Sequence, residues 1–358
     1  SQLSQLSQLS QLSQLSQLSQ LSQLSIKAFS LRTMNSFRTI VTPDKPPFTI
    51  THADKLISIG SCFSENIGLK FRDYKFSINI NPFGQQYNPY SIAVAIHRLL
   101  EAKPYTAEEL VHHDELYHSF DHHGSFSKST VDDTLQYINS NLQQASTDLK
   151  NATLLFLTFG TSHVFTLKDS GAYVSNCHKL SGTYFERKVL KPQEIISALR
   201  NAIDALRAVN PNIKIVATVS PVRYFAFGHH ENSVSKAHLF TAINELQEIY
   251  NDIYYFPAYE LVMDDLRDYR FFAEDMLHPN YQATNYVWEV LSNTMLDKKT
   301  SSMMKEIDEI LLAARHRPRN PNSDAHRKFV MKYISKIDDM QTKGLSFDKE
   351  LEILKKQL

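Results

Sequence analysis

Two short stretches, far apart in the chain, hold side chains that could carry out nucleophilic catalysis. Residues 60–65 read GSCFSE and bring together Ser61, Cys62 and Ser64. Residues 275–278 read DMLH and set a carboxylate close to an imidazole. In such a pair the histidine accepts the nucleophile's proton and later protonates the leaving group, while the carboxylate fixes its tautomer. The residue types are therefore suited to nucleophilic catalysis through a covalent intermediate, provided that the fold joins the two stretches.

Both stretches fall at junctions of an expected α/β fold. Residues 56–59 form a short apolar run that predicts a buried strand, and a helix is expected to begin near Ser64. Further strands and helices alternate along the chain, with strands at 76–80, 152–160, 213–220 and 253–256 and helices at 88–102, 192–210, 233–250 and 281–296. This alternation predicts right-handed crossovers and a mainly parallel sheet, whose ligands bind where the strands end. Residues 163–167 and 172–176 predict a β-hairpin insertion.

The overall composition limits the possible partners and locations. The 358 residues include 38 Lys and Arg and 38 Asp and Glu, so net charge gives no reason to expect a nucleic acid or an anionic membrane as partner. Cys62 and Cys177 are the only cysteines, which excludes a disulfide framework. The sequence contains neither a run of about 18 apolar residues nor a secretory signal. We therefore expect a cytoplasmic protein; its oligomeric state stays open.

The two ends of the chain differ from the middle. Residues 1–25 repeat the triplet SQL, whose leucines drift around a helix without forming one stripe. We predict that residues 1–33 are a disordered leader and that natural translation starts at Met34; intact-mass detection of the SQL tract in the native protein would contradict this. Residues 34–297 are expected to form the α/β domain. The charged helices of 298–358 are expected to pack on it as an extension, with a partner-binding arm as the alternative.

The order of the motifs resembles one known family. GSCFSENIG (60–68) is followed by NPFG, FGTSHVF, NCHK, TVSPVR, ENSVSK and AEDMLHPN. This order is similar to that of the GSCFA family in the SGNH or GDSL hydrolase superfamily, from about Met34 onward and including the C-terminal helices. Ser64 stands where the family more often has alanine. The resemblance implies a flavodoxin-like three-layer α/β/α sandwich with a mainly parallel sheet, a catalytic triad and no cofactor.

The resemblance also implies the roles of the two catalytic stretches. Aligned without a gap to the superfamily's G-D-S-L-[TS]-E pattern, Cys62 takes the place of the nucleophilic serine and Ser61 that of the aspartate. This register is favoured because residues 63–65 then match the apolar, hydroxyl and acidic positions. A helix N-terminus and an imidazolium both favour a thiolate. Cys62 is the preferred nucleophile, with Ser61 or a non-catalytic motif as alternatives, His278 as the base and Asp275 as its orienting group.

Two further motifs imply an oxyanion hole. Gly84 of NPFG falls near the superfamily glycine whose backbone N–H donates to the oxyanion. Ser162 of FGTSH takes the place of an asparagine that donates from its side chain, although a serine hydroxyl reaches less far than an amide. His163 is a substitute for Ser162. Loop packing is the alternative for these residues.

Other polar residues are weaker candidates. Arg223, Asn232 and Lys236, together with residues 176–179, would either bind substrate or anchor loops. The histidines at 112, 113, 118, 122 and 123 lack a convincing ligand spacing, so no metal is expected.

The preferred hypothesis is an ester hydrolase that acts on an acyl or acetyl ester of a small molecule or glycan. The alternatives are an acyltransferase with the same mechanism and a non-catalytic module that binds a glycan or a protein partner.

Overall fold

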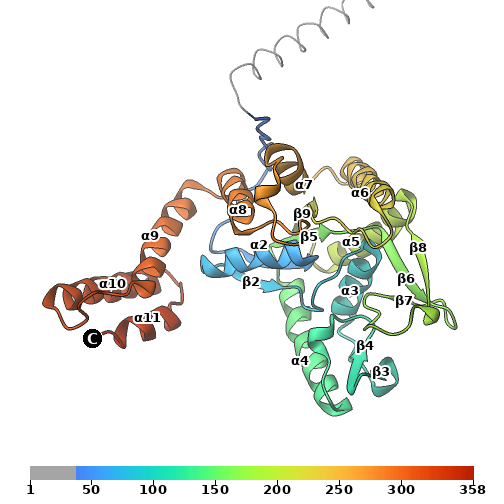
Figure 1. Ribbon diagram of the computed structural model, residues 1–358, viewed down its shortest axis with the longest axis horizontal. Helices are drawn as coiled ribbons and strands as arrows, with labels where there is room; N and C mark the ends of the chain where they lie inside the picture. The colour runs from blue at the N-terminus through green and yellow to red at the C-terminus, as the bar shows by residue number, and fades with distance from the viewer. Residues whose placement is uncertain (1–37) are drawn as a thin grey trace, which may run out of the picture.

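A five-stranded parallel sheet lies at the centre of the computed structural model, which describes residues 38–358 (Figure 1). The predictions for the SQL leader and for a start at Met34 lie outside the described residues. The strands are β1 (Lys55–Gly60), β2 (Ser77–Ile80), β5 (Leu154–Phe159), β9 (Lys214–Val219) and β10 (Ile253–Tyr255). Their order is β10-β9-β5-β1-β2, and every neighbouring pair is parallel. This is the flavodoxin-like order, with its switch point between β1 and β5, and it confirms the predicted fold class.

Helices cover both faces of the sheet. One face packs against α3 (Pro89–Glu101), α4 (Val131–Lys150), α5 (Pro192–Val209) and α6 (His229–Ile249), and the other against α2 (Cys62–Asp73), α7 (Ala258–Glu260) and α8 (Tyr281–Met295). Within β5, Leu155 and Leu157 join the first apolar cluster, whereas Leu154 and Phe156 join the second. Because successive strand residues point to opposite faces, a nearly all-apolar strand supplies both layers.

Local signals place most of these elements correctly. The Asn88 side chain accepts a hydrogen bond from the Ser91 N–H at 2.8 Å, and Pro89 is the first residue of α3, as predicted. Helix α2 begins at Cys62, earlier than the predicted start near Ser64. The sequence analysis did not predict α4, whose polar residues give it few apolar positions.

Two small antiparallel units extend from the sheet. Strands β3 (Leu110–His113) and β4 (Leu116–Ser119) form a hairpin. The predicted insertion after β5 is confirmed as β6 (His163–Leu167) and β7 (Tyr173–Val174), and β8 (Phe185–Val189) pairs with β6 as an additional strand. Single-turn helices lie at Ala107–Glu109, Gly124–Phe126, Gly182–Tyr184, Leu261–Asp265 and Tyr269–Phe271.

The C-terminal helices have an apolar core of their own. Helices α9 (Lys298–Arg315), α10 (Asp324–Thr342) and α11 (Asp348–Lys355) pack around the fully buried Phe347. They meet the domain at the turn after α2, where Lys75 Nζ lies 2.9 Å from Glu350 Oε1 and 4.8 Å from the centre of the Phe347 ring. Figure 1 shows α10 and α11 reaching away from the sheet, while Met304 of α9 joins the apolar cluster that α2 and α8 form. The packing of the whole extension on the domain stays a prediction.

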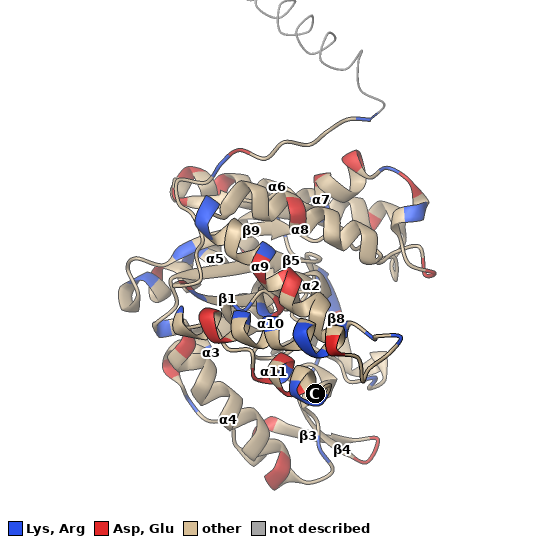
Figure 2. Cartoon of the chain, turned by 90° about the vertical axis from the view of Figure 1, so that its left-hand side faces the viewer, with Lys and Arg blue, Asp and Glu red and all other residues tan. Residues whose placement is uncertain are grey.

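The surface is mixed in charge. Basic and acidic residues are interspersed over the face that Figure 2 presents, in keeping with the balanced composition. In the described part of the chain, every helix is too short or too polar to cross a bilayer.

Candidate functional site

A cavity of about 640 Å³ lies at the carboxyl ends of β1, β5 and β9. This position coincides with the switch point of the sheet, where open parallel sheets bind ligands. Its wall carries both free cysteines of the chain. Other lining residues include Ser61, Tyr87, Asn88, Thr161, His163, Phe165, Arg223, Tyr224, Leu277 and His278. The fold thus joins the two stretches that the sequence analysis set apart as reactive.

Asp275 and His278 form a tightly hydrogen-bonded pair at the rim of this cavity. His278 Nδ1 lies 2.6 Å from Asp275 Oδ2, and Asp275 Oδ1 accepts the backbone N–H groups of Leu277 and His278, each at 2.9 Å. The His278 N–H, followed by the Leu277 N–H and the imidazole, holds the pKa of Asp275 at about 2. Met276 adopts a left-handed backbone with φ of 60°, which folds the loop back on itself. An ionised carboxylate therefore fixes one ring nitrogen of His278.

Cys62 is the first residue of α2, immediately after the end of β1. Gly60 permits this abrupt junction, because a Cβ there would lie 2.4 Å from the Thr158 carbonyl oxygen of β5. Ser61 is 1% exposed and its hydroxyl has no partner within residues 38–358, whereas Cys62 is only partly buried. Cys62 and His278 both line the cavity, without a direct hydrogen bond between them in the described chain.

Several groups act on the Cys62 thiol. Burial is the largest influence and raises its pKa, and Glu65 raises it further. The Phe63 backbone N–H and the charge of Lys236 lower the pKa. The predicted effect of the helix N-terminus is therefore present, but burial outweighs it.

The structure does not bring the two implied oxyanion donors to the cavity. The Gly84 N–H donates to Asn81 O at 2.7 Å, and neither the Gly84 backbone nor its neighbours in NPFG line the wall. Its φ of 76° and the approach of His123, whose Cβ would lie 2.3 Å from an added Cβ, explain the glycine as a turn residue. Ser162 is fully buried, and its N–H donates to Ser235 Oγ at 2.7 Å. Both residues hold loops, which was the alternative for this motif.

Backbone donors that the sequence analysis did not name lie beside Cys62. In the first turn of α2 the N–H groups of Cys62 and Phe63 have no backbone acceptor within residues 38–358, and the Ser61 side chain does not cap them; both N–H groups act on the Cys62 thiol instead. The N–H groups of Gly160 and Thr161, by contrast, are both taken by Tyr87 O. The start of the helix at the cysteine itself was the signal that could have identified the donors of α2.

His163 lines the cavity and stands out among its polar groups. It is 2% exposed, and neither ring nitrogen has a hydrogen-bond partner in the described chain. Burial lowers its pKa, so the ring is neutral at physiological pH and presents one donor and one acceptor. Such a buried, unsatisfied imidazole is suited to a polar group of a ligand.

One face of α6 anchors the loops that follow β5 and β9. Asn232 Oδ1 accepts the Tyr224 N–H at 2.9 Å, and Ser235 Oγ lies 3.0 Å from Thr161 Oγ1. Lys236 is 2% exposed and does not line the cavity; its ammonium donates to two backbone carbonyls. Asn232 and Lys236 thus take the loop-anchoring role that the sequence analysis offered beside substrate binding.

Arg223 and the NCHK motif lie differently. Arg223 lines the cavity, is exposed, and contacts Met263 Sδ at 3.5 Å. Asn176 and Cys177 also line the cavity, whereas His178 Nε2 lies 2.8 Å from Ser119 O and is held in the structure. Arg223 is therefore the predicted substrate-binding cation that reaches the cavity.

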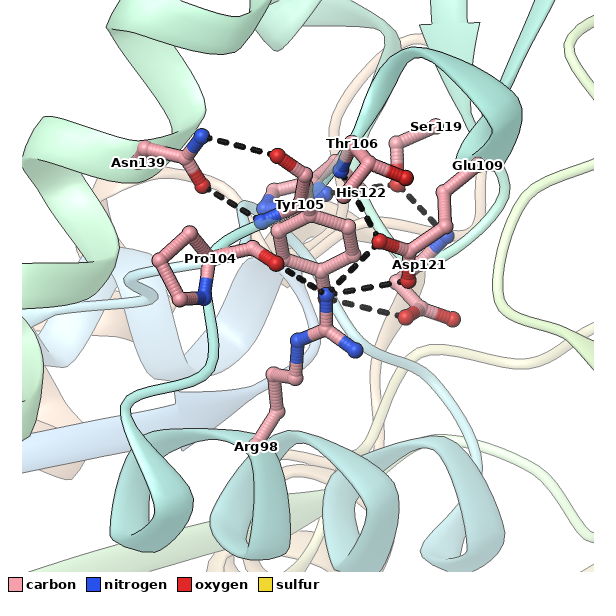
Figure 3. Close-up of polar contacts among 9 residues, drawn as sticks. All are labelled: Arg98, Pro104, Tyr105, Thr106, Glu109, Ser119, Asp121, His122 and Asn139. Carbon is pink, nitrogen blue, oxygen red and sulfur yellow. Dashed lines mark hydrogen bonds and ion pairs between the residues drawn. The ribbon is translucent and has the colours of Figure 1, made fainter.

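The histidine-rich segment forms part of a buried polar network (Figure 3). His122 Nδ1 lies 2.9 Å from Ser119 Oγ, and burial lowers the His122 pKa to about 3. Beside it, the Tyr105 hydroxyl donates to Asp121 Oδ2 at 2.9 Å, and Arg98 pairs with a neighbouring glutamate. Across residues 38–358, no three His, Cys, Asp or Glu side chains are grouped to hold a metal ion. These contacts account for the cluster as structural packing.

Comparison with known families decides the assignment. The model of the GSCFA family matches residues 55–291, which is more than half of the chain. The chain belongs to the GSCFA family. A second model, described as the C-terminal domain of GSCFA domain proteins, matches residues 307–358 of this GSCFA chain. It therefore covers the helical extension.

No curated protein matches this GSCFA chain. Among solved structures, it is similar to a carbohydrate esterase family 3 protein from Talaromyces cellulolyticus, with 8% identity, a TM-score of 0.34, and 71% of this chain and 99% of that chain covered. It is also similar to a family 3 carbohydrate esterase of Clostridium thermocellum (12% identity, TM-score 0.31, 70% and 97% covered). The acetyl xylan esterase Est2A of Butyrivibrio proteoclasticus gives 14% identity, a TM-score of 0.34, and 69% and 64% covered. These scores are too low to bear on activity.

Proposed function

We propose that this GSCFA chain is an SGNH-like hydrolase that cleaves an acyl ester of a small molecule or glycan through a thioester on Cys62. His278 takes the thiol proton, and the thiolate attacks the ester carbonyl. The tetrahedral intermediate collapses as the C–O bond breaks, and the imidazolium gives its proton to the leaving alcohol. Water, activated by the same imidazole, then hydrolyses the thioester. Asp275 holds the imidazole in the required tautomer and stabilises its charged form.

The observation that carries this proposal is the Asp275–His278 hydrogen bond on a cavity that Cys62 also lines. The exposure of the two candidate nucleophiles supports Cys62: both residues line the cavity, but Ser61 is 1% exposed whereas Cys62 is only partly buried. The topology with its switch point at β1 and β5 also supports the superfamily assignment. A nucleophilic thiol requires reducing surroundings, which fits the predicted cytoplasmic location.

Donors near Cys62 suit the developing oxyanion. The N–H groups of Cys62 and Phe63 at the start of α2, which lack a backbone acceptor in the described chain, take the role first given to Gly84. His163 takes the side-chain role first given to Ser162, or binds a hydroxyl of the substrate, and Arg223 contacts the part of the substrate nearer the rim.

Hydrolysis of p-nitrophenyl acetate tests the proposal. We expect wild-type turnover, a loss of about 10³-fold or more in Cys62→Ala and His278→Ala, and near wild-type rates in Ser61→Ala. Cys177→Ala is the matched control, because it removes the other thiol of the same cavity. Peptide mass spectrometry after a rapid quench should find the acetyl group on Cys62.

The alternatives give different results. Activity that survives Cys62→Ala and is lost in Ser61→Ala would transfer the nucleophile to Ser61. Faster loss of the acetyl-enzyme on addition of a sugar, with acetylated sugar as the product, would identify an acyltransferase. No turnover by any form, with only slow thiol labelling, would favour the non-catalytic binding module.

A further inference from the structure

Lys236 is a buried cation at the base of the candidate site. It lies in α6, is 2% exposed, and donates from Nζ to Gly160 O at 2.7 Å and Ser220 O at 2.6 Å. Gly160 and Ser220 are the first residues after β5 and β9, and both line the cavity that holds Cys62. The ammonium thus joins two strand ends directly beneath the cavity floor.

No carboxylate balances this charge. Within residues 38–358, Lys236 makes no ion pair with Asp or Glu, and its two hydrogen bonds go to neutral carbonyls. A buried ammonium without an anion is costly, so a structural cross-link alone would be served better by an uncharged donor. Burial favours the neutral amine, and a negative charge within the site would favour the ammonium.

Cys62 is the group able to supply that charge. Cys62 lines the same cavity as Gly160 and Ser220, whose carbonyls accept from the ammonium. The Lys236 charge therefore lowers the Cys62 pKa, and a Cys62 thiolate raises the Lys236 pKa. The other groups that face the pair are Arg223, which opposes the ammonium, and Glu65, which opposes the thiolate. The Tyr259 ring lies 5.9 Å from Nζ, the Tyr87 hydroxyl interacts with Cys62, and His278 lines the same cavity.

We propose that Lys236 is a positioning residue of the site, whose ammonium stabilises the Cys62 thiolate while holding the ends of β5 and β9 in place. The inference rests on the proposed function only in taking Cys62 as the reactive thiol. When Cys62 loses its proton, the cation and the thiolate neutralise one another, and the buried site carries no net charge. A thiolate that burial alone would disfavour is thereby formed beside the imidazole.

Alkylation of Cys62 by iodoacetamide tests this directly, because it reports the thiolate without any ester turnover. The background is full-length Cys177→Ser, in which Cys62 is the single thiol. Rates are measured by mass spectrometry from pH 5.5 to 9.5 for this background, for Lys236→Met, and for Lys305→Met as a control at an exposed position of α9.

The expected result has a characteristic pH dependence. Burial lowers the Lys236 pKa to about 7, so its charge is present below that pH and is lost above it. Below pH 7, Lys236→Met should therefore react at least about tenfold more slowly, which corresponds to a shift of one pKa unit in Cys62. Above pH 7 the loss of the Lys236 charge offsets the gain in thiolate, so the alkylation rate of the background levels off. The rate of Lys236→Met keeps rising with pH, so the difference between the two rates should shrink above pH 8. Lys305→Met should follow the background throughout.

A ratio between background and Lys236→Met that is constant with pH would overturn the proposal and leave Lys236 as a cross-link only. If circular dichroism shows that Lys236→Met does not fold, the pH dependence of alkylation in the Cys177→Ser background is the test. A background rate that rises tenfold per pH unit through pH 7 and 8, without levelling, would also overturn the proposal. Failure of the proposed function would give a different result from failure of this inference. Alkylation of Cys62 would still depend on Lys236, but neither the wild type nor any variant would hydrolyse p-nitrophenyl acetate.

Discussion

His163 contributes a polar ring to the cavity and receives no hydrogen bond from the described chain in return. Tyr224 and Phe227 pack against the ring, with centroids 6.0 Å and 5.1 Å away, but both nitrogens are buried and unsatisfied. A polar group in this state costs about 1–3 kcal/mol of folding free energy. We infer that His163 is a binding group whose ring nitrogens form hydrogen bonds when substrate is present.

His163→Phe should therefore stabilise the chain while impairing it as an enzyme. The free energy of unfolding in urea should rise by about 1 kcal/mol, and kcat/KM for p-nitrophenyl acetate should fall at least tenfold. His118→Phe is the control: the His118 nitrogens contact Ser127 Oγ at 2.6 Å and His113 O at 2.9 Å, so this change should destabilise the fold. Loss of stability in His163→Phe would show that its nitrogens are satisfied in the free protein.

Asp275→Asn should keep the loop geometry and remove the charge that the imidazolium needs. We expect kcat to fall on the order of 10²- to 10⁴-fold, with Asp338→Asn on the exposed surface of α10 unchanged. The Asp275 pKa of about 2 lies below its unfolded value of about 3.9, so its contribution to stability is present above pH 4 and is lost as the pH falls toward 2. The difference in urea midpoint between wild type and Asp275→Asn should vanish over that range; equal kcat values would exclude Asp275 from catalysis.

Residue types and short spacings were enough to select Cys62 and His278 as candidates, and the structure places both on one cavity. The pair Asp275 and His278 is local, three positions apart, so one loop decides its geometry. Gly84 and Ser162 were assigned as oxyanion donors from their positions in motifs. Both lie outside the cavity wall, held by contacts with His123 and Ser235 that are distant in sequence and that no local pattern encodes. The unsatisfied ring of His163 could not be predicted from the sequence, because which buried groups lack a hydrogen-bond partner depends on the packing of the whole molecule.

At the scale of elements, the junction of β1 and α2 is set by the close approach of β1 to β5. A Cβ on Gly60 would lie 2.4 Å from Thr158 O and 2.7 Å from Thr158 Cβ, and neither can move without displacing β5. Gly60→Ala should thus destabilise the chain by about 1–3 kcal/mol in urea unfolding and slow ester turnover. Gly182→Ala, with no atom near its added Cβ, should change neither property. A neutral Gly60→Ala would mean that β1 and β5 are free to separate.

Strands β1, β5 and β9 were predictable because they are short, mostly apolar and buried on both faces. Helix α4 was not, since its apolar positions Leu135, Ile138 and Leu142 stand among mostly polar residues; in the structure α4 packs against α3. Strand β8 was missed for a similar reason: FERKV is mostly charged and exposed, and it becomes a strand by pairing with β6. Tertiary pairing overrides weak local preference in both cases.

At the scale of the whole molecule, the helical extension and the α/β domain meet through few side chains. Phe347→Ala should open the extension's core at a cost of about 3–5 kcal/mol to that unit, because Phe347 is fully buried. We expect rapid proteolysis within residues 298–358. The kcat/KM for p-nitrophenyl acetate should stay within about twofold of wild type, because the cavity lies at the start of α2 whereas the extension contacts the turn after the end of α2. Leu312→Ala, at an exposed position of α9, is the control. Parallel loss of activity and extension would show that the two parts fold as one cooperative unit.

Two parts of the chain form the cavity wall: the insertion between β5 and α5, and the α/β core. Phe165, Val174 and Cys177 come from the small antiparallel sheet and its loops, whereas Cys62 is the first residue of α2 and His278 lies in the loop before α8. Changes in the length or sequence of the insertion can therefore reshape the pocket during evolution without disturbing the reactive groups. On the proposed function, this division would keep one chemistry while the accepted substrates change.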